Sequence, residues 1–167
     1  MKVDPDELRA ELARLAGLPV SRQTFAGNSM LLWLGPHPRS ADAIGLFIHP
    51  VWQLVLHGGG IVSSDECPMP DPDPSPEYDR HVRSFWDRAG RLAGLRVQRA
   101  ALLMPGLRLL IAFEGGATLE QWPPEPDGDV ADDANDGTED WNLRLYASDM
   151  RYTIGAGGIV RGSVEHG

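Results

Sequence analysis

The chain opens with apolar residues at the three-to-four-residue spacing of an amphipathic helix. They fall on one helical face and are Leu8, Leu12 and Leu15. Asp4 stands before them and suits the N-cap, where its side chain accepts a hydrogen bond from a free backbone N–H group. Pro5 suits the first helical position, and Gly17 suits the end of a helix. The pattern predicts a first helix between Asp4 and Gly17.

The same pattern returns in the middle of the chain after Ser75 and Pro76, which again suit an N-cap and a first helical position. A broader apolar stripe follows, made of Tyr78, Val82, Phe85, Trp86 and Ala89. We predict a second helix here that ends near Gly90 or Gly94.

Strand patterns follow both predicted helices. In residues 107–113 every second position is apolar and the positions between them are mixed, as in a strand with one buried face. Glycine-containing turns separate several of these segments. The predicted strands cover residues 18–27, 29–35, 43–50, 52–56 and 61–64 after the first helix, and residues 95–104, 107–113, 117–122, 141–145 and 150–155 after the second.

Two short sequence words occur twice. RLAGL starts at Arg14 and at Arg91, 77 residues apart, and W-x-L-x-L starts at Trp52 and at Trp141, 89 residues apart. The predicted elements around these words come in the same order, so we predict a duplicated unit of about 80 residues. The predicted fold class is α+β, with two similar helix-plus-antiparallel-meander halves related by a pseudo-twofold, about ten strands and two helices.

The repeat also predicts how one compact domain is divided. The first repeat covers residues 1–65, a Pro/Asp-rich linker covers 66–76, and the second repeat covers 77–167. The two W-x-L-x-L words lie 12 residues further apart than the two RLAGL words, so the second repeat contains an insertion. We place this insertion at 123–140. This acidic insertion holds eight carboxylates and no base. They are Glu125, Asp127, Asp129, Asp132, Asp133, Asp136, Glu139 and Asp140.

Charge and composition exclude several classes of function. The formal net charge is −9, the opposite of the sign that nucleic-acid binding needs. The longest apolar run, residues 100–113, is interrupted and too short to span a membrane. Cys67 is the only cysteine, and the acidic first ten residues lack the apolar region of a signal peptide, so we predict a cytoplasmic protein. The 15 basic residues include one lysine, which indicates a GC-rich bacterial genome.

One glycine-rich word resembles a catalytic loop. Residues 57–60 read HGGG, as in the oxyanion-hole loop of lipases and esterases. That chemistry needs a G-x-S-x-G word downstream, and none follows; the nearest serine context, around Ser29, lies upstream and lacks the second glycine. We interpret residues 57–60 as a turn between two strands.

Metal and cofactor patterns also fail. The spacing of His49, His57, Asp65 and Cys67 matches no zinc pattern. A calcium loop centred on Gly137 has Ala134 where a ligand is needed, and no helix can follow the glycines at 155–158. A general acid and a general base could come from among three carboxylates, although no sequence pattern singles them out: Asp87, Glu114 and Glu120. We predict no metal, no cofactor and no catalytic residue.

The chain resembles small acidic bacterial proteins of a kind common in actinobacteria. The features that carry the resemblance are the helix, the meander that ends in W-x-L at Trp52 and Trp141, and the short glycine turn. Some of these are grouped with immunity proteins of toxin systems. The resemblance implies a protein-binding function and brings no catalytic residues.

The predicted function is protein binding without catalysis, in an immunity or antitoxin-like role in which acidic residues neutralise a basic protein partner. The predicted partner-binding residues are Trp122 and the eight carboxylates of the acidic insertion. The alternative is a small ligand-binding module or an enzyme with a pocket between the two halves. A structural subunit of a larger assembly is a third possibility, and the predicted oligomeric state is a monomer or a homodimer.

Overall fold

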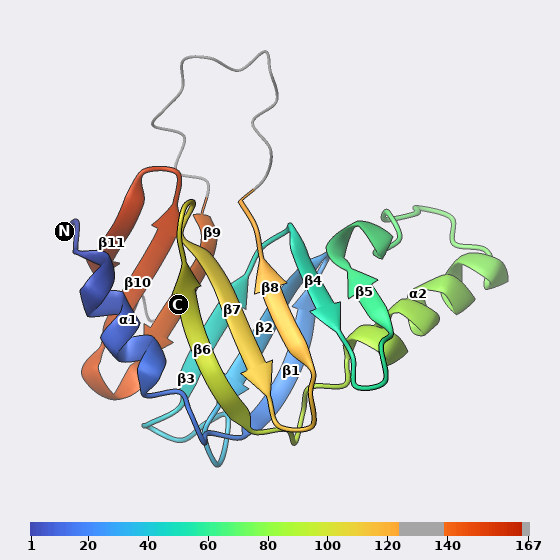
Figure 1. The fold of residues 1–167 in the computed structure, drawn as a ribbon. Helices are drawn as coiled ribbons and strands as arrows, with labels where there is room; N and C mark the ends of the chain where they lie inside the picture. The colour runs from blue at the N-terminus through green and yellow to red at the C-terminus, as the bar shows by residue number, and fades with distance from the viewer. Residues whose placement is uncertain (124–138, 165–167) are drawn as a thin grey trace.

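The computed structural model describes residues 1–123 and 139–164. The helices in these ranges are α1 (Pro5–Ala13) and α2 (Pro76–Ala89), with short 3-10 turns η1 (Ser64–Glu66) and η2 (Tyr146–Ser148). The strands are β1 (Val20–Ala26), β2 (Ser29–Leu34), β3 (Ile44–Ile48), β4 (Trp52–Val55), β5 (Ile61–Ser63), β6 (Val97–Leu103), β7 (Arg108–Phe113), β8 (Thr118–Gln121), β9 (Glu139–Leu145), β10 (Met150–Gly155) and β11 (Gly158–Gly162). The α+β class with two helices and about ten strands is confirmed (Figure 1).

Both helices begin where the sequence predicts. The Asp4 carboxylate and the Ser75 hydroxyl each accept a hydrogen bond from a backbone N–H group of the first turn, at 2.8 and 3.1 Å. The helix α1 is shorter than predicted, because the chain leaves it after Ala13 and runs through a turn to Gly17. The helix α2 ends with Gly90 as its C-cap, as predicted.

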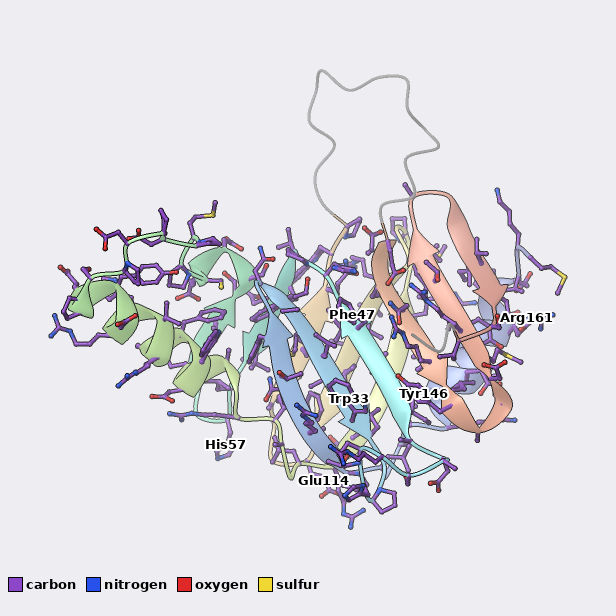
Figure 2. All side chains as sticks on the ribbon, turned by 180° about the vertical axis from the view of Figure 1, so that it is seen from behind. Trp33, Phe47, His57, Glu114, Tyr146 and Arg161 are labelled. Carbon is purple, nitrogen blue, oxygen red and sulfur yellow. The ribbon has the colours of Figure 1, made fainter. Side chains whose placement is uncertain are left out.

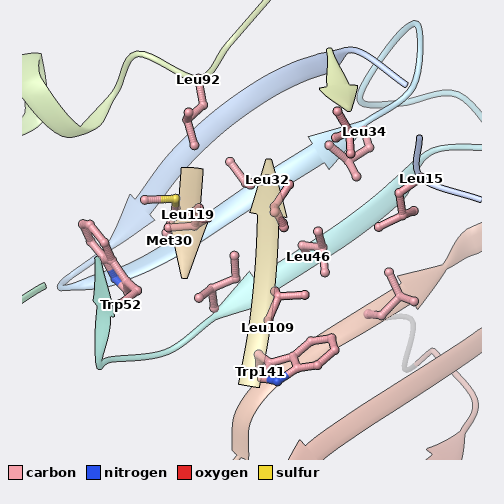
Figure 3. Packing of buried hydrophobic residues seen from close by; sticks show 14 of the residues in the cluster. Leu15, Met30, Leu32, Leu34, Leu46, Trp52, Leu92, Leu109, Leu119 and Trp141 are labelled. Atoms are coloured by element: carbon pink, nitrogen blue, oxygen red, sulfur yellow. The ribbon is translucent and has the colours of Figure 1, made fainter. Parts of the chain in front are cut away.

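Two antiparallel sheets pack face to face as a sandwich, with one helix near each end (Figure 1). The strand orders are β1-β2-β3-β9-β10-β11 in the six-stranded sheet and β5-β4-β8-β7-β6 in the five-stranded sheet. Apolar side chains from both sheets fill the space between them (Figure 3). Among them Trp52, Leu32, Leu109, Leu119 and Trp141 are fully buried.

The two predicted halves share both sheets. The first half supplies β1, β2 and β3 to the six-stranded sheet, and then β4 and β5 to the five-stranded sheet. The second half supplies β6, β7 and β8 to the five-stranded sheet and β9 to β11 to the six-stranded sheet. Each half therefore completes the sheet of the other half, whereas the sequence predicts one meander per half. Residues 67–75, within the predicted linker, contain no helix or strand.

Each RLAGL word is hydrogen-bonded to the valine that follows the other word. The Gly17 N–H donates to the Val97 carbonyl at 2.7 Å, and the Gly94 N–H donates to the Val20 carbonyl at 2.8 Å. In turn, the Val20 N–H donates to the Leu95 carbonyl at 2.7 Å, and the Val97 N–H donates to the Leu18 carbonyl at 2.9 Å. Both glycines have a left-handed φ, 86° and 88°, which favours glycine over residues with a side chain. The words therefore join the first strand of each half at one point of the fold.

The two repeated tryptophans also have matching surroundings. Trp52 and Trp141 are fully buried in β4 and β9, next to the ends of β8 and β3. Each indole N–H donates to a carbonyl in a hairpin turn, Asn28 at 2.7 Å and Leu107 at 3.1 Å. We call two positions counterparts when they take the same place in the strand order and register of the two sheets. A pseudo-twofold relation of the halves stays a prediction.

Candidate binding face and polar network

The outer face of the six-stranded sheet carries aromatic and arginine side chains (Figure 2). Side chains alternate along a strand, so in β2 the buried Leu32 points to the core while Leu31 and Trp33 point outward. We call the following set the aromatic–arginine face: Arg22, Leu31, Trp33, Phe47, Arg144 and Tyr146. Arg22 is exposed and the other five are half-buried. No helix of the described residues lies over this face (Figure 2).

Arginine side chains lie over the aromatic rings of this face. Arg22 pairs with Trp33 across the strands, Trp33 pairs with Gly45, and Gly45 pairs with Arg144. The guanidinium carbon of Arg22 is 5.3 Å from the centre of the Trp33 ring, and that of Arg144 is 5.7 Å from the centre of Phe47. Such cation–π contacts stabilise exposed pairs by about 0.5–1 kcal/mol. They hold large side chains in defined positions before any partner binds.

Gly45 makes a shallow hollow in the middle of this row. A β-carbon at this position would lie 3.3 Å from Cε2 of Tyr146, whose ring covers the glycine. The depression around it has a volume of about 20 Å³. A second depression lies on the other side of Tyr146, with a volume of about 240 Å³, and Glu11, Asp42 and Ile44 are among its lining residues. Pockets for small molecules usually have volumes of roughly 300–1,000 Å³. Both depressions are smaller, so this region is a surface with shallow depressions rather than an enclosed pocket.

The counterpart positions on the five-stranded sheet lack these side chains. Strand register places Ala112 as the counterpart of Trp33, Glu120 as that of Phe47 and Val55 as that of Arg144. Glu120 forms an ion pair with Arg108 at 2.8 Å. At these positions one sheet therefore has alanine, valine and an ion-paired glutamate, and the other has aromatic and arginine side chains.

A polar network borders the aromatic–arginine face where β3 of the first half meets β9 of the second. Ser29 Oγ lies 3.0 Å from Nδ1 of His49. The other ring nitrogen of His49, Nε2, lies 3.6 Å from Oε1 of Glu139. The His49 ring also packs on Phe47, with the ring centres 4.8 Å apart. Ser29 is 8% exposed, while the His49 side chain is 33% exposed, so the network is open to solvent on the histidine side.

Glu139 is held as an anion in this network. Burial alone would raise the pKa of its carboxyl group, but hydrogen bonds from His49 and Asn142, together with the charge and hydrogen bond of Arg151, lower this pKa to about 2. The Asn142 amide and the Arg151 guanidinium donate to the two different carboxylate oxygens. These contacts link β3, β9 and β10. They also fix the orientation of the carboxylate that faces His49.

Two carboxylates that the sequence assigns to the acidic insertion belong to a strand. Glu139 and Asp140 begin β9, where Asp140 is 7% exposed and its carbonyl accepts a hydrogen bond from the His49 N–H at 3.0 Å. Burial raises the pKa of Asp140, and the nearby charge of His49 opposes this shift. The insertion as predicted, residues 123–140, therefore overlaps the sheet by two residues.

The other predicted partner-binding residues are not brought together by the described structure. Trp122 is half-buried, and its backbone pairs with that of Val51. The remaining six carboxylates lie outside the described residues: Glu125, Asp127, Asp129, Asp132, Asp133 and Asp136. The residues of the tested calcium loop from 132 to 137 lie there too.

The remaining sequence candidates fall in turns or in other contacts. Residues 57–60 form the β4–β5 turn, with positive φ at Gly58 and Gly59, so the turn interpretation is confirmed. Residues 155–158 contain the β10–β11 turn. Within residues 1–123 and 139–164, no three His, Cys, Asp or Glu side chains converge in a way that could hold a metal ion. His49 lies beside Ser29 instead of facing His57 or Cys67.

Sequence reasoning missed the contact among Ser29, His49 and Glu139. The three residues lie 20 and 90 positions apart, and only the exchange of β9 into the first sheet brings them together. No spacing rule covers such a distance. The contact between Ser29 and His49 could have been predicted, because both residues face outward at paired ends of two neighbouring predicted strands.

Comparisons with protein-family models, curated proteins and solved structures give no match to this chain. In the part of the chain that the structure describes, no helix is long and apolar enough to cross a membrane.

Proposed function

We propose that this protein is a protein-binding module and that the aromatic–arginine face is its interface. The observation that carries the proposal is the arrangement of Trp33, Phe47 and Tyr146 with Arg22 and Arg144 on a sheet face that no described helix covers. Trp, Tyr, Phe and Arg are the residues enriched in the centres of protein interfaces. Shallow dents also suit side chains of a protein partner better than they suit a free small molecule.

The contrast between the two sheets supports the same proposal. Folding alone does not require the aromatic side chains, because the five-stranded sheet is built with Ala112 and Glu120 at counterpart positions. A half-buried tryptophan on the outer face of one sheet, and an alanine at the counterpart position of the other, indicate a function that belongs to one face.

We further propose an immunity or antitoxin-like role in the cytoplasm, with a basic protein as the partner. The net charge of −9 attracts such a partner over long distances and raises the association rate. The aromatic–arginine face then supplies short-range contacts, while exposed carboxylates beside it such as Asp42 pair with basic side chains. Deleting residues 125–138 should slow association at low salt and reduce its salt dependence, with Glu139 left in place.

We also propose that the two halves are related by duplication and a pseudo-twofold. Strand orders β1-β2-β3-β9-β10 and β6-β7-β8-β4-β5 support this proposal, as do the reciprocal hydrogen bonds of Gly17 and Gly94. Both first strands also shift register after their valine, Val20 in one and Val97 in the other. Superposition of residues 12–65 on 89–155 tests it: Trp52 and Trp141 must fall together.

A matched pair of leucines tests the binding proposal. Leu31 and its counterpart Leu110 are both half-buried on the outer face of a sheet, so Leu31→Ala and Leu110→Ala remove the same atoms. The partners to test are the products of the genes next to this one, each coexpressed, copurified and titrated by calorimetry. Leu31→Ala should weaken binding about tenfold and Trp33→Ala about thirtyfold or more. Leu110→Ala should change the affinity less than about twofold.

Two results would contradict the proposal. One is that no neighbouring gene product binds. The other is that a product binds but Leu31→Ala and Leu110→Ala weaken it equally, which would remove the aromatic–arginine face from the interface.

A second candidate function is an enzyme with its site at the junction of the two halves. The observation that favours it is the contact of Ser29 and His49 from the first half with Glu139 from the second.

A further inference from the structure

We propose that Ser29, His49 and Glu139 form a nucleophilic site that hydrolyses small acyl esters, with Ser29 as nucleophile, His49 as general base and Glu139 as positioning residue. The inference goes beyond partner binding and does not depend on it. It departs from the expectation that the chain is not an enzyme.

The spacing of the three groups fits these roles. A serine nucleophile needs a base within hydrogen-bond reach, and Ser29 Oγ lies 3.0 Å from Nδ1 of His49. The base needs a third group that orients it, and the Glu139 carboxylate lies 3.6 Å from Nε2. A carboxylate on that side favours the tautomer with its proton on Nε2. The lone pair of Nδ1 then faces the serine hydroxyl, as proton abstraction requires.

The carboxylate is itself held firmly. Asn142 is fully buried and donates to one oxygen of Glu139, and Arg151 donates to the other. The network also keeps an unused donor, since the buried Nε of Arg151 has no hydrogen-bond partner among the described residues.

The fold does not need these three residues. The counterpart of Ser29 is Arg108, and the counterpart of His49 is Trp122. The five-stranded sheet therefore forms the same strand pairs without a serine and a histidine in contact. Their presence on one sheet alone points to chemistry rather than to strand pairing.

The burial of Ser29 indicates the class of substrate. Ser29 is 8% exposed, and the ring of His49 beside it packs on Phe47 with the ring centres 4.8 Å apart. The space next to the serine hydroxyl is therefore small, so the acyl group we assign is acetyl.

The reaction follows the usual two steps of acyl transfer. Ser29 Oγ attacks the ester carbonyl carbon while its proton passes to Nδ1 of His49. The C–O bond to the leaving alcohol then breaks, and the alcohol departs with the proton from His49. Water next attacks the acetyl-Ser29 ester, giving its proton to His49. The acetate group leaves as acetic acid, and Ser29 regains its hydroxyl proton.

The test uses the full chain with a fluorophosphonate probe and with p-nitrophenyl acetate. The probe should form one Oγ–phosphorus bond on Ser29 with loss of fluoride, and digestion with mass spectrometry should map the adduct to that residue. Ser29→Ala should remove the adduct, and Ser29→Ala and His49→Gln should each lower ester turnover at least about 100-fold. Glu139→Gln should lower kcat with KM unchanged, which separates a positioning role from loss of the fold.

Ser21→Ala is the matched control. Ser21 is a half-buried serine on the neighbouring strand, and its hydroxyl donates to the Trp33 carbonyl at 3.1 Å. This variant should keep both labelling and turnover. Exposed histidines such as His57 also attack nitrophenyl esters, so a turnover rate that survives Ser29→Ala would overturn the inference. Absence of an adduct on Ser29 in the unmodified chain would overturn it as well, and that measurement needs no variant to fold.

Discussion

Replacing Glu139 by glutamine removes a negative charge from the polar network and keeps the size of the side chain. The pKa of Glu139 is lowered from 4.5 to about 2. Each pKa unit corresponds to about 1.4 kcal/mol. The ionised carboxylate therefore stabilises the fold by about 3 kcal/mol at neutral pH. Its side chain is 16% exposed and that of Arg151 is 25% exposed, so solvent screens the contact only in part.

We expect Glu139→Gln to lower the free energy of unfolding by about 2–3 kcal/mol at pH 7, because glutamine keeps part of the hydrogen bonding and leaves Arg151 without its counter-charge. For a domain of this length the melting temperature should fall by about 4–10 °C. The pH dependence has a defined sign. Since folding lowers the pKa of this acid, its contribution is complete above about pH 4.5 and is lost as the pH falls towards 2.

Urea unfolding followed by tryptophan fluorescence measures this difference directly. The difference in free energy of unfolding between the unmodified chain and Glu139→Gln should fall to about half its pH 7 value at pH 3. Glu120→Gln is the control, because Glu120 is paired with Arg108 at 2.8 Å with 27% of its side chain exposed. It should cost less than about 1 kcal/mol at both pH values. An equal gap for Glu139→Gln at pH 7 and pH 3 would refute the electrostatic reasoning.

Two further outcomes follow from the fold. Burial and the Glu7 carboxylate raise the pKa of Tyr152 to about 12, so the last step in the rise of phenolate absorbance, near pH 12, should be absent in Tyr152→Phe. The stability that this tyrosine contributes should fall as the pH rises above about 10. Gly17→Ala and Gly94→Ala should each cost about 1–2 kcal/mol by thermal melting, because both positions have a left-handed φ, and unequal costs would contradict matching roles.

The starts of the helices could be predicted from sequence because capping is local. Asp4 and Ser75 sit one residue before a proline, and each side chain bonds a backbone N–H group within three residues. The predicted end of α1 is wrong by about one turn, since Gly17 closes the turn after the helix rather than the helix itself. Strands were found for a similar reason, because alternation of buried and outward residues is written into each segment.

The pairing of the strands could not be predicted, because it depends on contacts between residues far apart in the chain. The sequence predicts a meander in each half, yet β4 leaves β3 and pairs with β8 of the other half. The order of elements is the same for separate halves and for exchanged halves. The pairings of β3 with β9 and of β4 with β8, which include Trp141 and Trp52, distinguish them.

Glu139 and Asp140 show that composition alone does not separate a loop from the start of a strand. A run of carboxylates without a base suggests a solvated loop. In the structure both residues lie in β9, where Glu139 pairs with Gly155 and Asp140 lies at a register shift. Asn142 and Arg151 donate to the Glu139 carboxylate, and the His49 N–H donates to the Asp140 backbone carbonyl. These donors come from β9, from β10 and from the residue that follows β3. Charge along the chain therefore could not show where the insertion ends.

The counterpart relation helps to separate what the fold requires from what a function uses. Buried positions match closely between the two sheets, as Leu32 and Leu46 of one sheet correspond to Ile111 and Leu119 of the other. Most outward positions differ in size, charge and chemistry, as at Trp33 and Ala112 or Phe47 and Glu120, whereas Leu31 and Leu110 are alike. A residue that only stabilises strand pairing should tolerate exchange with its counterpart. Trp33→Ala and Phe47→Glu install the counterpart side chains, so they should leave the melting temperature within about 2–4 °C while binding is lost. A fold that collapses under these two exchanges would mean that the aromatic–arginine face is there for stability.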